Sequence, residues 1–128
     1  MEGRAAKSSQ IPEKGHMGAL QNEPKKADLQ LTAVLYALSD DTRLQIVQSL
    51  AKTPEIACSY FDIHMPKSSL SHHFRVLRTS GVITTRKEGT ALLNRLRRED
   101  LSERFPGVLE SVLAASTACL AAGERSIR

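Results

Sequence analysis

One face of a short predicted helix carries side chains that are suited to binding DNA. The helix lies within residues 66–81, which read PKSSLSHHFRVLRTSG. Residues spaced by three and four positions share a helical face, and here they are Ser68, Ser71, His72 and Arg75. Hydroxyl, imidazole and guanidinium groups can donate hydrogen bonds to base edges and phosphates in the DNA major groove. A merely solvated face usually carries Glu as well, whereas this stretch contains no acidic residue.

The opposite face of the same helix is apolar, which predicts contact with a hydrophobic core. Leu70, Phe74 and Leu77 recur at i, i+4 and i+7, the spacing of a buried helical stripe. Gly81 follows the last of the periodic residues, so we expect it to end the helix as its C′ residue.

Three helices are predicted before this one, and together they would support it. The first begins near Asp28, a candidate N-cap, and ends near residue 38. The second follows Ser39 as its N-cap and has two aspartates in its first turn. A third, short helix is expected over residues 53–61, with Pro54 in its first turn.

A β-hairpin is predicted directly after the DNA-binding helix. Residues 82–85 are all β-branched, residues 86–90 form a turn that contains glycine and basic residues, and residues 91–96 return as a second strand. Helix–turn–helix followed by a basic hairpin is the winged helix-turn-helix arrangement. We therefore predict a mainly α fold of about five helices with a two-stranded wing.

The last predicted helix, from Pro106 to about residue 122, is apolar over a wide arc. A domain this small cannot cover such an arc alone, so we expect a homodimer formed by the first and last helices. The expected interface residues are Leu31, Val34, Leu35, Val108, Val112, Ala115 and Cys119.

Composition limits the class of protein. The chain has 128 residues, 41% of them hydrophobic, and a net charge of +4, so one domain and a polyanionic partner are expected. We expect residues 1–27 to be a disordered tail, residues 28–123 to form the domain and residues 124–128 to be a second tail. With no long apolar segment and no secretory signal, we expect no membrane contact and a cytoplasmic location.

Three runs of sequence resemble the ArsR/SmtB family of bacterial transcriptional repressors. They are LSDDTRLQIVQSL, SSLSHHFRVLRTSGVI and RKEGTALLNRL, and the resemblance covers roughly residues 30–120. It implies a dimeric repressor of double-stranded DNA that binds a pseudo-palindromic operator. It also implies major-groove contacts from Lys67, Ser68, Ser71 and His72, contacts near the backbone from Arg75 and Arg78, and wing contacts from Arg86 and Lys87.

The chain departs from the metal-binding members of that family. Glu55 and Ala57 stand where those members carry a C-x-C pair, and no histidine follows His73. His72 and His73 are adjacent in a helix, where they point about 100° apart and cannot bind one ion from a single face. We therefore expect no metal site and no cofactor.

Three alternatives remain open from the sequence. Cys58 and Cys119 could form a thiol switch, although small buried hydrophobes are the more ordinary interpretation. The fold could also serve as a protein–protein interaction module with a solvated basic face. An inducer, either a small molecule or an oxidant, is not identified by the sequence. Catalysis is not expected, because adjacent Ser71 and His72 do not supply a nucleophile, a base and an orienting acid at one point.

Overall fold

Five α-helices and three strands make up the part of the chain that the computed structural model describes, residues 22–61 and 63–121, with side chains to residue 118. In chain order the elements are the 3-10 turn η2 (Lys26–Asp28), α2 (Leu31–Ala37), α3 (Asp41–Lys52), β1 (Ile56–Ala57), the 3-10 turn η3 (Cys58–Tyr60), α4 (Lys67–Ser80), β2 (Ile83–Glu88), β3 (Ala91–Leu96), α5 (Arg98–Arg104) and α6 (Val108–Ala121). The mainly α fold with a hairpin wing is thus confirmed.

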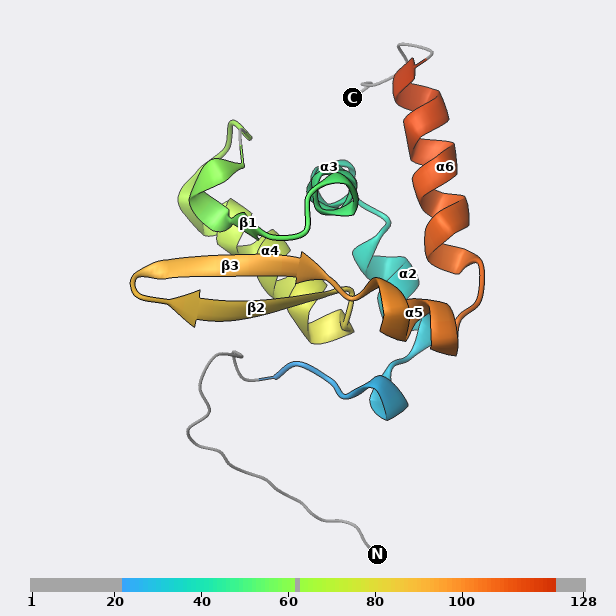
Figure 1. The fold of residues 1–128 in the computed structure, drawn as a ribbon. Helices are drawn as coiled ribbons and strands as arrows, with labels where there is room; N and C mark the ends of the chain where they lie inside the picture. The colour runs from blue at the N-terminus through green and yellow to red at the C-terminus, as the bar shows by residue number, and fades with distance from the viewer. Residues whose placement is uncertain (1–21, 62, 122–128) are drawn as a thin grey trace, which may run out of the picture.

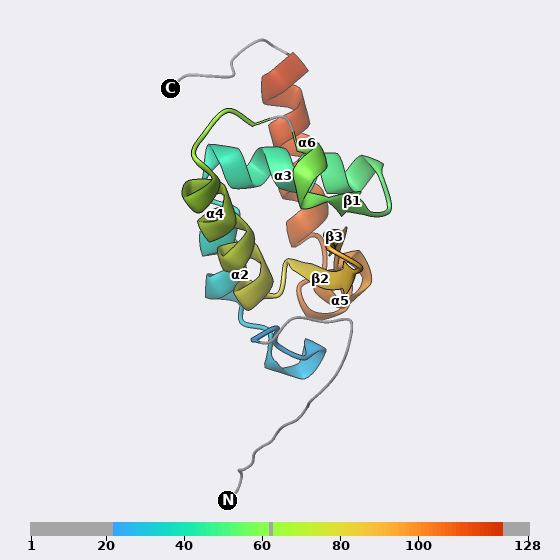
Figure 2. The ribbon, with the colours of Figure 1, turned by 90° about the vertical axis from the view of Figure 1, so that its left-hand side faces the viewer.

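The helices α2, α3 and α4 pack together, and an antiparallel sheet of order β1-β3-β2 lies against them (Figures 1 and 2). The strands β2 and β3 are longer than β1, and the hairpin that they form extends past β1 as the wing. At the other end of the molecule, α6 packs on α3 and α5, far from the tip of the wing. The core between these layers is built mainly from aliphatic side chains, including Ile46, Leu77 and Ile83, each of which is fully buried.

The predicted third helix is wrong. Residues 56–57 instead form β1, which pairs antiparallel with β3 in the register Ile56 to Asn94, and a 3-10 turn follows. The Asn94 Nδ2 donates to the Ile56 carbonyl at 3.1 Å, which fixes this register. Residues 56–57 therefore pair with the edge of β3 instead of forming a helix. Their preference for a helix is weak, so pairing with a strand distant in the sequence decides their structure.

A short helix, α5, occupies residues 98–104, where the sequence predicted no element. Glu99 and Asp100 lie in its first turn and Arg104 in its last, as the helix dipole favours. Leu101 is 1% exposed and anchors the helix to the core. The following helix, α6, accordingly begins at Val108, two residues later than predicted.

Two predicted caps are also displaced by one or more residues. The N-cap of α3 is Asp40, whose carboxylate accepts a hydrogen bond from the Arg43 amide at 3.1 Å, and not Ser39. Asp28 lies in η2, and α2 begins after Gln30.

Residues 22–27, predicted to be part of a disordered tail, are held against the edge of the sheet. The Glu23 carboxylate accepts hydrogen bonds from the Thr85 amide at 2.9 Å and from the Thr84 hydroxyl at 2.7 Å. β2 is an edge strand, so Glu23 satisfies a backbone donor that the sheet leaves unpaired. The remaining tail residues, 1–21 and 124–128, lie outside the described part of the chain, as does the predicted helix stop at Gly123.

Candidate nucleic-acid interface

Helix α4 presents its polar face to solvent and its apolar face to the core, as predicted. Phe74 is 3% exposed and Leu77 is fully buried, whereas the side chains of the opposite face are open to solvent. The exposed residues of this face are Lys67, Ser68, Ser71, His72 and Arg75. Arg78, one turn beyond Arg75, is half-buried.

The C-terminus of α4 turns sharply into the wing at Gly81. This residue has φ +88°, and the amides of Gly81 and Val82 donate to the carbonyls of Arg78 and Leu77. A Cβ at Gly81 would also collide with the buried side chain of Leu29. Glycine is therefore required both by the left-handed backbone and by the close approach of the N-terminal segment.

A buried arginine, Arg43, holds α4 against α2 and α3. Its side chain is nearly inaccessible and donates to the carbonyls of Ala37 at 2.7 Å and Tyr36 at 3.1 Å, the last turn of α2. Its Nη1 lies 3.1 Å from Nδ1 of His73 on α4. Since a guanidinium only donates, Nδ1 of His73 is the acceptor and carries no proton.

Sequence reasoning did not identify Arg43 as a positioning residue. The sequence does indicate that Arg43 is buried, because Arg43, Val47 and Leu50 lie at i, i+4 and i+7, the spacing of the buried face of α3. A charged residue at such a position must find hydrogen-bond acceptors inside the protein, and here the open end of α2 supplies them. His73, the partner of Arg43 on α4, is itself partly buried, with a side chain 15% exposed.

Burial lowers the pKa of His73, and its charged neighbours act in opposite directions. Removal of the imidazole from water is the largest effect, the Asp40 carboxylate raises the pKa, and Arg43 and His72 lower it. The Asp40 Oδ2 lies 3.7 Å from Nδ1 of His73. The neutral imidazole is therefore the form that fits between α3 and α4.

A cleft of about 450 Å³ separates α4 from the wing. Lys67, Ser71, Arg75 and Arg78 line it from the helix, while residues 90–92 line it from the hairpin. A groove with cationic side chains on one wall and a hairpin on the other can admit a sugar–phosphate strand. Sequence reasoning did not find Thr90, whose side chain is exposed in the turn at the tip of the wing.

Arg86 and Lys87, the two basic residues of β2, point to opposite faces of the hairpin. Successive residues of a strand alternate between faces, and β2 pairs Lys87 with Leu92 and Arg86 with Leu93. Leu92 lines the cleft beside α4, so Lys87 lies on the face of the hairpin that faces α4. Arg86 lies on the other face and is not part of one surface with α4.

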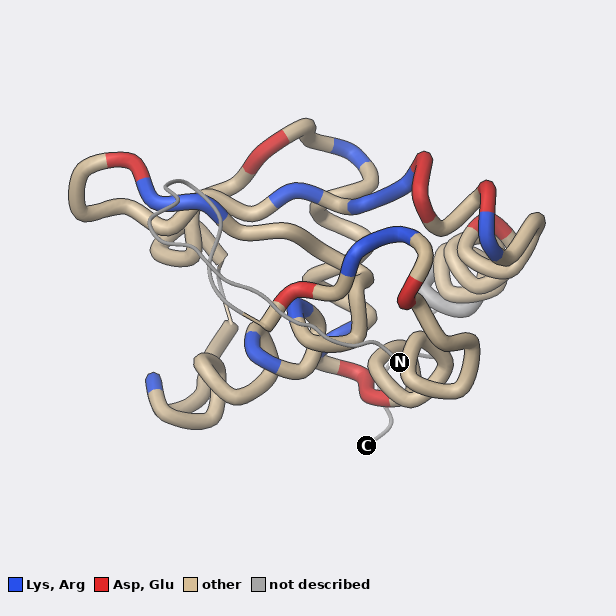
Figure 3. The backbone as a smooth tube through the Cα atoms, turned by 90° about the horizontal axis from the view of Figure 1, so that it is seen from below, with Lys and Arg blue, Asp and Glu red and all other residues tan. Residues whose placement is uncertain are grey.

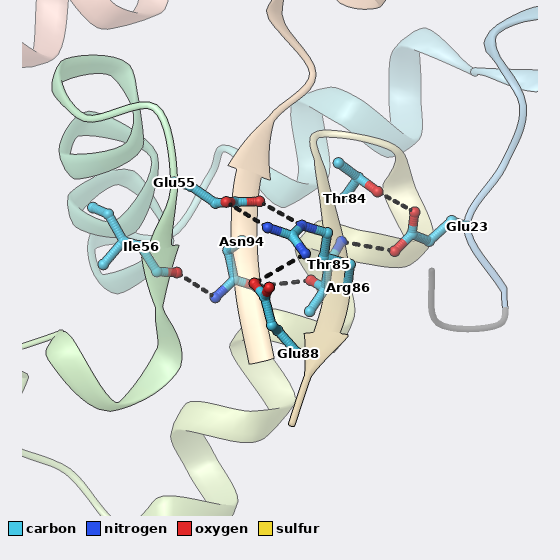
Figure 4. Close-up of polar contacts among 8 residues, drawn as sticks. All are labelled: Glu23, Glu55, Ile56, Thr84, Thr85, Arg86, Glu88 and Asn94. Atoms are coloured by element: carbon cyan, nitrogen blue, oxygen red, sulfur yellow. Dashed lines mark hydrogen bonds and ion pairs between the residues drawn. The ribbon is translucent and has the colours of Figure 1, made fainter. Parts of the chain in front are cut away.

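Arg86 is also engaged in a network of ion pairs, shown in Figure 4. Its Nε and Nη2 donate to the two carboxylate oxygens of Glu55 at 2.9 and 3.0 Å, and its Nη1 lies 3.1 Å from Glu88. These hydrogen bonds lower the pKa of Glu55 below its usual range. Arg86 thus ties the wing to the start of β1, and Lys87 is the wing cation better placed for a phosphate.

Lys and Arg occur both on α4 and along the hairpin and the start of α5 (Figure 3). Acidic side chains adjoin several of these cations, as Glu55 and Glu88 adjoin Arg86. The four cations on the cleft side, Lys67, Arg75, Arg78 and Lys87, form no ion pair with any residue in the described part of the chain. The cleft side of the molecule is therefore its most openly cationic surface.

The residues expected at a dimer interface do not all lie on the surface. Leu31 and Leu35 of α2 are 40% and 44% exposed and lie one helical turn apart. Val34, in contrast, is 1% exposed within its own core, so its place in the predicted interface is wrong.

On α6, Val108 and Val112 are half-buried and Ala115 is exposed. The side chain of Cys119 lies outside the described residues. Leu109 and Leu113 of the same helix belong to the core, which narrows the apolar arc that the sequence suggested. The face of α6 that remains open is therefore built from small side chains.

Cys58 is half-buried on the wall of the cleft, and its Sγ accepts a hydrogen bond from Asn94 Nδ2 at 3.2 Å. Asn94 is fully buried and also accepts from the Thr85 hydroxyl at 2.7 Å.

Among the residues that the structure describes, no three or more His, Cys, Asp or Glu side chains gather as metal ligands would. Within the same residues, no helix has the length and apolarity needed to cross a membrane.

Comparison with known proteins gives consistent matches. Residues 40–85 match the family profile described as bacterial regulatory protein, arsR family. An uncharacterized HTH-type transcriptional regulator of Bacillus subtilis, YceK, is 33% identical over 92 residues, which is 69% of this chain and 92% of that protein. The arsenical resistance operon repressor of Staphylococcus xylosus is 33% identical over 73 residues, 56% of this chain and 70% of the repressor. A solved ArsR family transcriptional regulator superposes with a TM-score of 0.51 and 25% identity, over 71% of this chain and 90% of that one.

Proposed function

This chain belongs to the ArsR family of bacterial transcriptional regulators, and on that basis we propose that it is a dimeric repressor that reads a pseudo-palindromic operator with α4. The observation that carries the proposal is the polar face of α4, which is exposed from Lys67 to Arg75 and bordered by a cationic cleft. A face that served only solubility would not need a positively charged groove between helix and hairpin.

The contacts divide into two kinds by position and chemistry. Ser68, Ser71 and His72 lie toward the N-terminal half of α4, where a recognition helix meets base edges, and they donate hydrogen bonds in a directional way. The cations that border this face, Lys67, Arg75, Arg78 and Lys87, are suited to phosphates. The first group would select the sequence, and the second would supply most of the affinity.

A dimer would be formed by α2 and α6. The two exposed leucines of α2, Leu31 and Leu35, lie one helical turn apart and form a stripe that a second copy would cover. Small residues on the open face of α6, such as Ala114 and Ala115, would allow close helix approach. A two-fold axis between such helices would present two copies of α4 to half-sites about 34–36 Å apart.

Repression would follow from occupancy. A dimer bound over a promoter excludes polymerase from the same duplex, and the related repressor of Staphylococcus xylosus is named for an operon that it represses. An inducer would act by changing the angle between the two α4 helices, because their separation must match the pitch of DNA.

Selection of bound sites from a pool of random duplexes tests the proposal. The full chain should enrich one motif with two inverted halves whose centres lie about 10 base pairs apart, or a multiple of that spacing. Enrichment without symmetry would reject the dimer and keep α4 as the reading element. A pool that stays random through successive rounds would reject sequence-specific binding, and would favour an interaction module for proteins.

A thiol-responsive regulator is a second candidate, favoured by the place of Cys58 on the wall of the cleft. Hydrogen peroxide would oxidise the thiolate to a sulfenic acid and release hydroxide, which adds an oxygen atom beside α4. If this is the signal, peroxide should weaken DNA binding of the native chain and leave the Cys58→Ser variant unaffected. Equal loss in both proteins would exclude Cys58.

A further inference from the structure

A second cleft, of about 570 Å³, opens on the side of the hairpin that carries Arg86 and Arg95. The C-terminal turn of α3, residues 53–55, strand β3 and the first turn of α5 enclose it. Its volume falls within the range of about 300–1,000 Å³ that is usual for small-molecule sites. None of the residues assigned to DNA base contact lines it.

Cationic side chains outnumber acidic ones around this cleft. The cations are Lys52, Arg86, Arg95 and Arg98, and the acids are Glu55 and Glu99. Glu55 is already bound to Arg86 by two hydrogen bonds, so most of its charge is compensated. Arg86 is also paired with Glu88, and Arg98 with Glu110, so the charges of the cleft that no described residue pairs are Lys52, Arg95 and Glu99. The cleft therefore keeps a small excess of positive charge.

Two of the four cations have hydrogen-bond donors to spare. Lys52 and Arg95 are exposed, and neither forms a hydrogen bond or an ion pair with the described residues. Arg98, in contrast, donates to Glu110 at 3.0 Å and to the Ala51 carbonyl at 3.4 Å. This second contact covers one of the open carbonyls at the end of α3, and so reduces the negative potential that a helix C-terminus brings to the cleft.

The floor of the cleft is apolar. Leu50, Pro54 and Leu96 line it between the charged side chains. Small-molecule sites commonly join an apolar surface to a few polar groups that fix orientation. A ligand with an acid group and a short hydrocarbon part would match both features of this cleft.

We propose that this cleft binds a small organic anion, carrying carboxylate or phosphate groups, through Lys52 and Arg95. The guanidinium of Arg95 offers a planar pair of donors that suits either kind of acid group, and Lys52 adds a mobile charge. The aliphatic part of the ligand would lie over Pro54 and Leu50.

Arg86 lines this cleft and belongs to β2 of the wing, so a ligand in the cleft could change the affinity of the chain for DNA. An acid group in the cleft competes with Glu55 for the fork of Arg86, because both are carboxylate-like acceptors. Release of Glu55 would loosen the attachment of β1 to the hairpin, and with it the position of the wing beside α4. This regulatory step rests on the proposed function, whereas the binding site itself does not.

Amide-resolved NMR titration of the full chain at constant ionic strength tests the site, with inorganic phosphate and succinate as separate probes. At least one probe should cause saturable shifts in residues 50–55 and 95–99, and the more effective probe identifies the acid group. Arg95→Gln and Lys52→Gln should each weaken this binding about tenfold. Arg104→Gln, an exposed arginine outside the cleft, is the matched control and should bind as the native chain does.

The site is rejected if neither probe saturates, if the saturable shifts fall on α4 and the tip of the wing, or if both cleft variants bind like the control. The regulatory step is tested separately by DNA affinity with and without the effective probe. The probe should change the Kd of the native chain several-fold and leave Arg95→Gln unchanged. An unchanged Kd in the native chain overturns the coupling. If the native chain binds no DNA even without a probe while the NMR shifts still saturate, the proposed function is rejected and the anion site is supported.

Discussion

Neighbouring wing residues of equal charge have different surroundings. Arg86 is held by Glu55 and Glu88 on the outer face of the hairpin, whereas Lys87 has no such partners in the described chain and shares a face with Leu92. The sequence shows two adjacent cations, and both were predicted to contact DNA from the wing. The alternation of a strand separates them, and it could have been applied before the structure was known. The contact between Arg86 and Glu55 could not have been predicted in this way, because the two residues are 31 positions apart in the sequence.

Removal of the Lys87 charge should lower the salt dependence of DNA binding. In Lys87→Ala, affinity should fall similarly for all duplexes, and the slope of log K against log salt should become shallower by about 0.9, the value for one phosphate contact. Arg86→Ala is the matched variant and should leave the slope nearly unchanged, since its charge is already paired. Fluorescence anisotropy over a salt series measures both, and equal slope changes in the two variants would restore the original prediction for Arg86.

Loss of a side chain that reads bases should instead affect sequence preference. Ser71→Ala and His72→Ala each remove a donor from the exposed face of α4, and each should cost about 1–3 kcal/mol on the selected duplex. On random duplexes the same variants should bind as the native chain does. A competition assay between the two duplexes gives the ratio, and an equal loss on both would remove Ser71 or His72 from base recognition.

Helix α4 is positioned by a polar contact from a neighbouring element as well as by packing. Arg43 closes the end of α2 and donates to His73, so three helices meet at one guanidinium. The predicted spans of α4 and of the second hairpin strand agree with the structure, and Gly81 ends the helix as expected. The first hairpin strand is longer than predicted, because residues 86–88, assigned to the turn, pair with residues 91–93 as part of β2. β1 was predicted as helix because its pairing partner lies 38 residues away, and α5 was missed although its charges follow the helix dipole.

The burial of His73 predicts a pH dependence of stability. Its pKa is lowered in the folded chain, so between that value and the ordinary value of about 6.5 the unfolded chain binds more protons. The free energy of unfolding should therefore fall as pH is lowered from about 6.5 toward the folded pKa, and this loss should end below it. Above about pH 7 the contribution is complete, since His73 is neutral in both states.

Thermal unfolding across this pH range measures the effect. His73→Gln should unfold at a Tm that depends less on pH than the native Tm does, whereas His72→Gln, an exposed neighbour on the same helix, should keep the native pH profile. A native profile in His73→Gln would show that His73 is not the group responsible.

On the scale of the whole molecule, the proposed dimer rests on the exposed leucines of α2. The sequence predicted an interface from the apolar periodicity of two helices, but periodicity does not say which side of a helix the chain's own core will use. Val34 was assigned to the interface for that reason, although it belongs to the core. Leu31 and Leu35 on α2 and Ala115 on α6 are the residues of that prediction that the structure leaves exposed.

A charge placed in that stripe should prevent association. Leu35→Glu should sediment as a monomer at concentrations where the native chain is a dimer, because a carboxylate would be buried without a partner. Its affinity for the selected operator should fall much further than its affinity for a single half-site. Gln45→Glu, which adds the same charge at an exposed position of α3, is the control. A monomeric native chain, or a dimeric Leu35→Glu, would contradict the interface.

The most direct test of sequence reading by α4 is the Kd of the full chain for the selected duplex and for a scrambled duplex of the same length, at one salt concentration. We expect the selected duplex to bind about 1,000-fold more tightly or better, the ordinary margin between specific and non-specific sites. Equal affinity for the two duplexes would contradict the claim that this helix recognises DNA sequence.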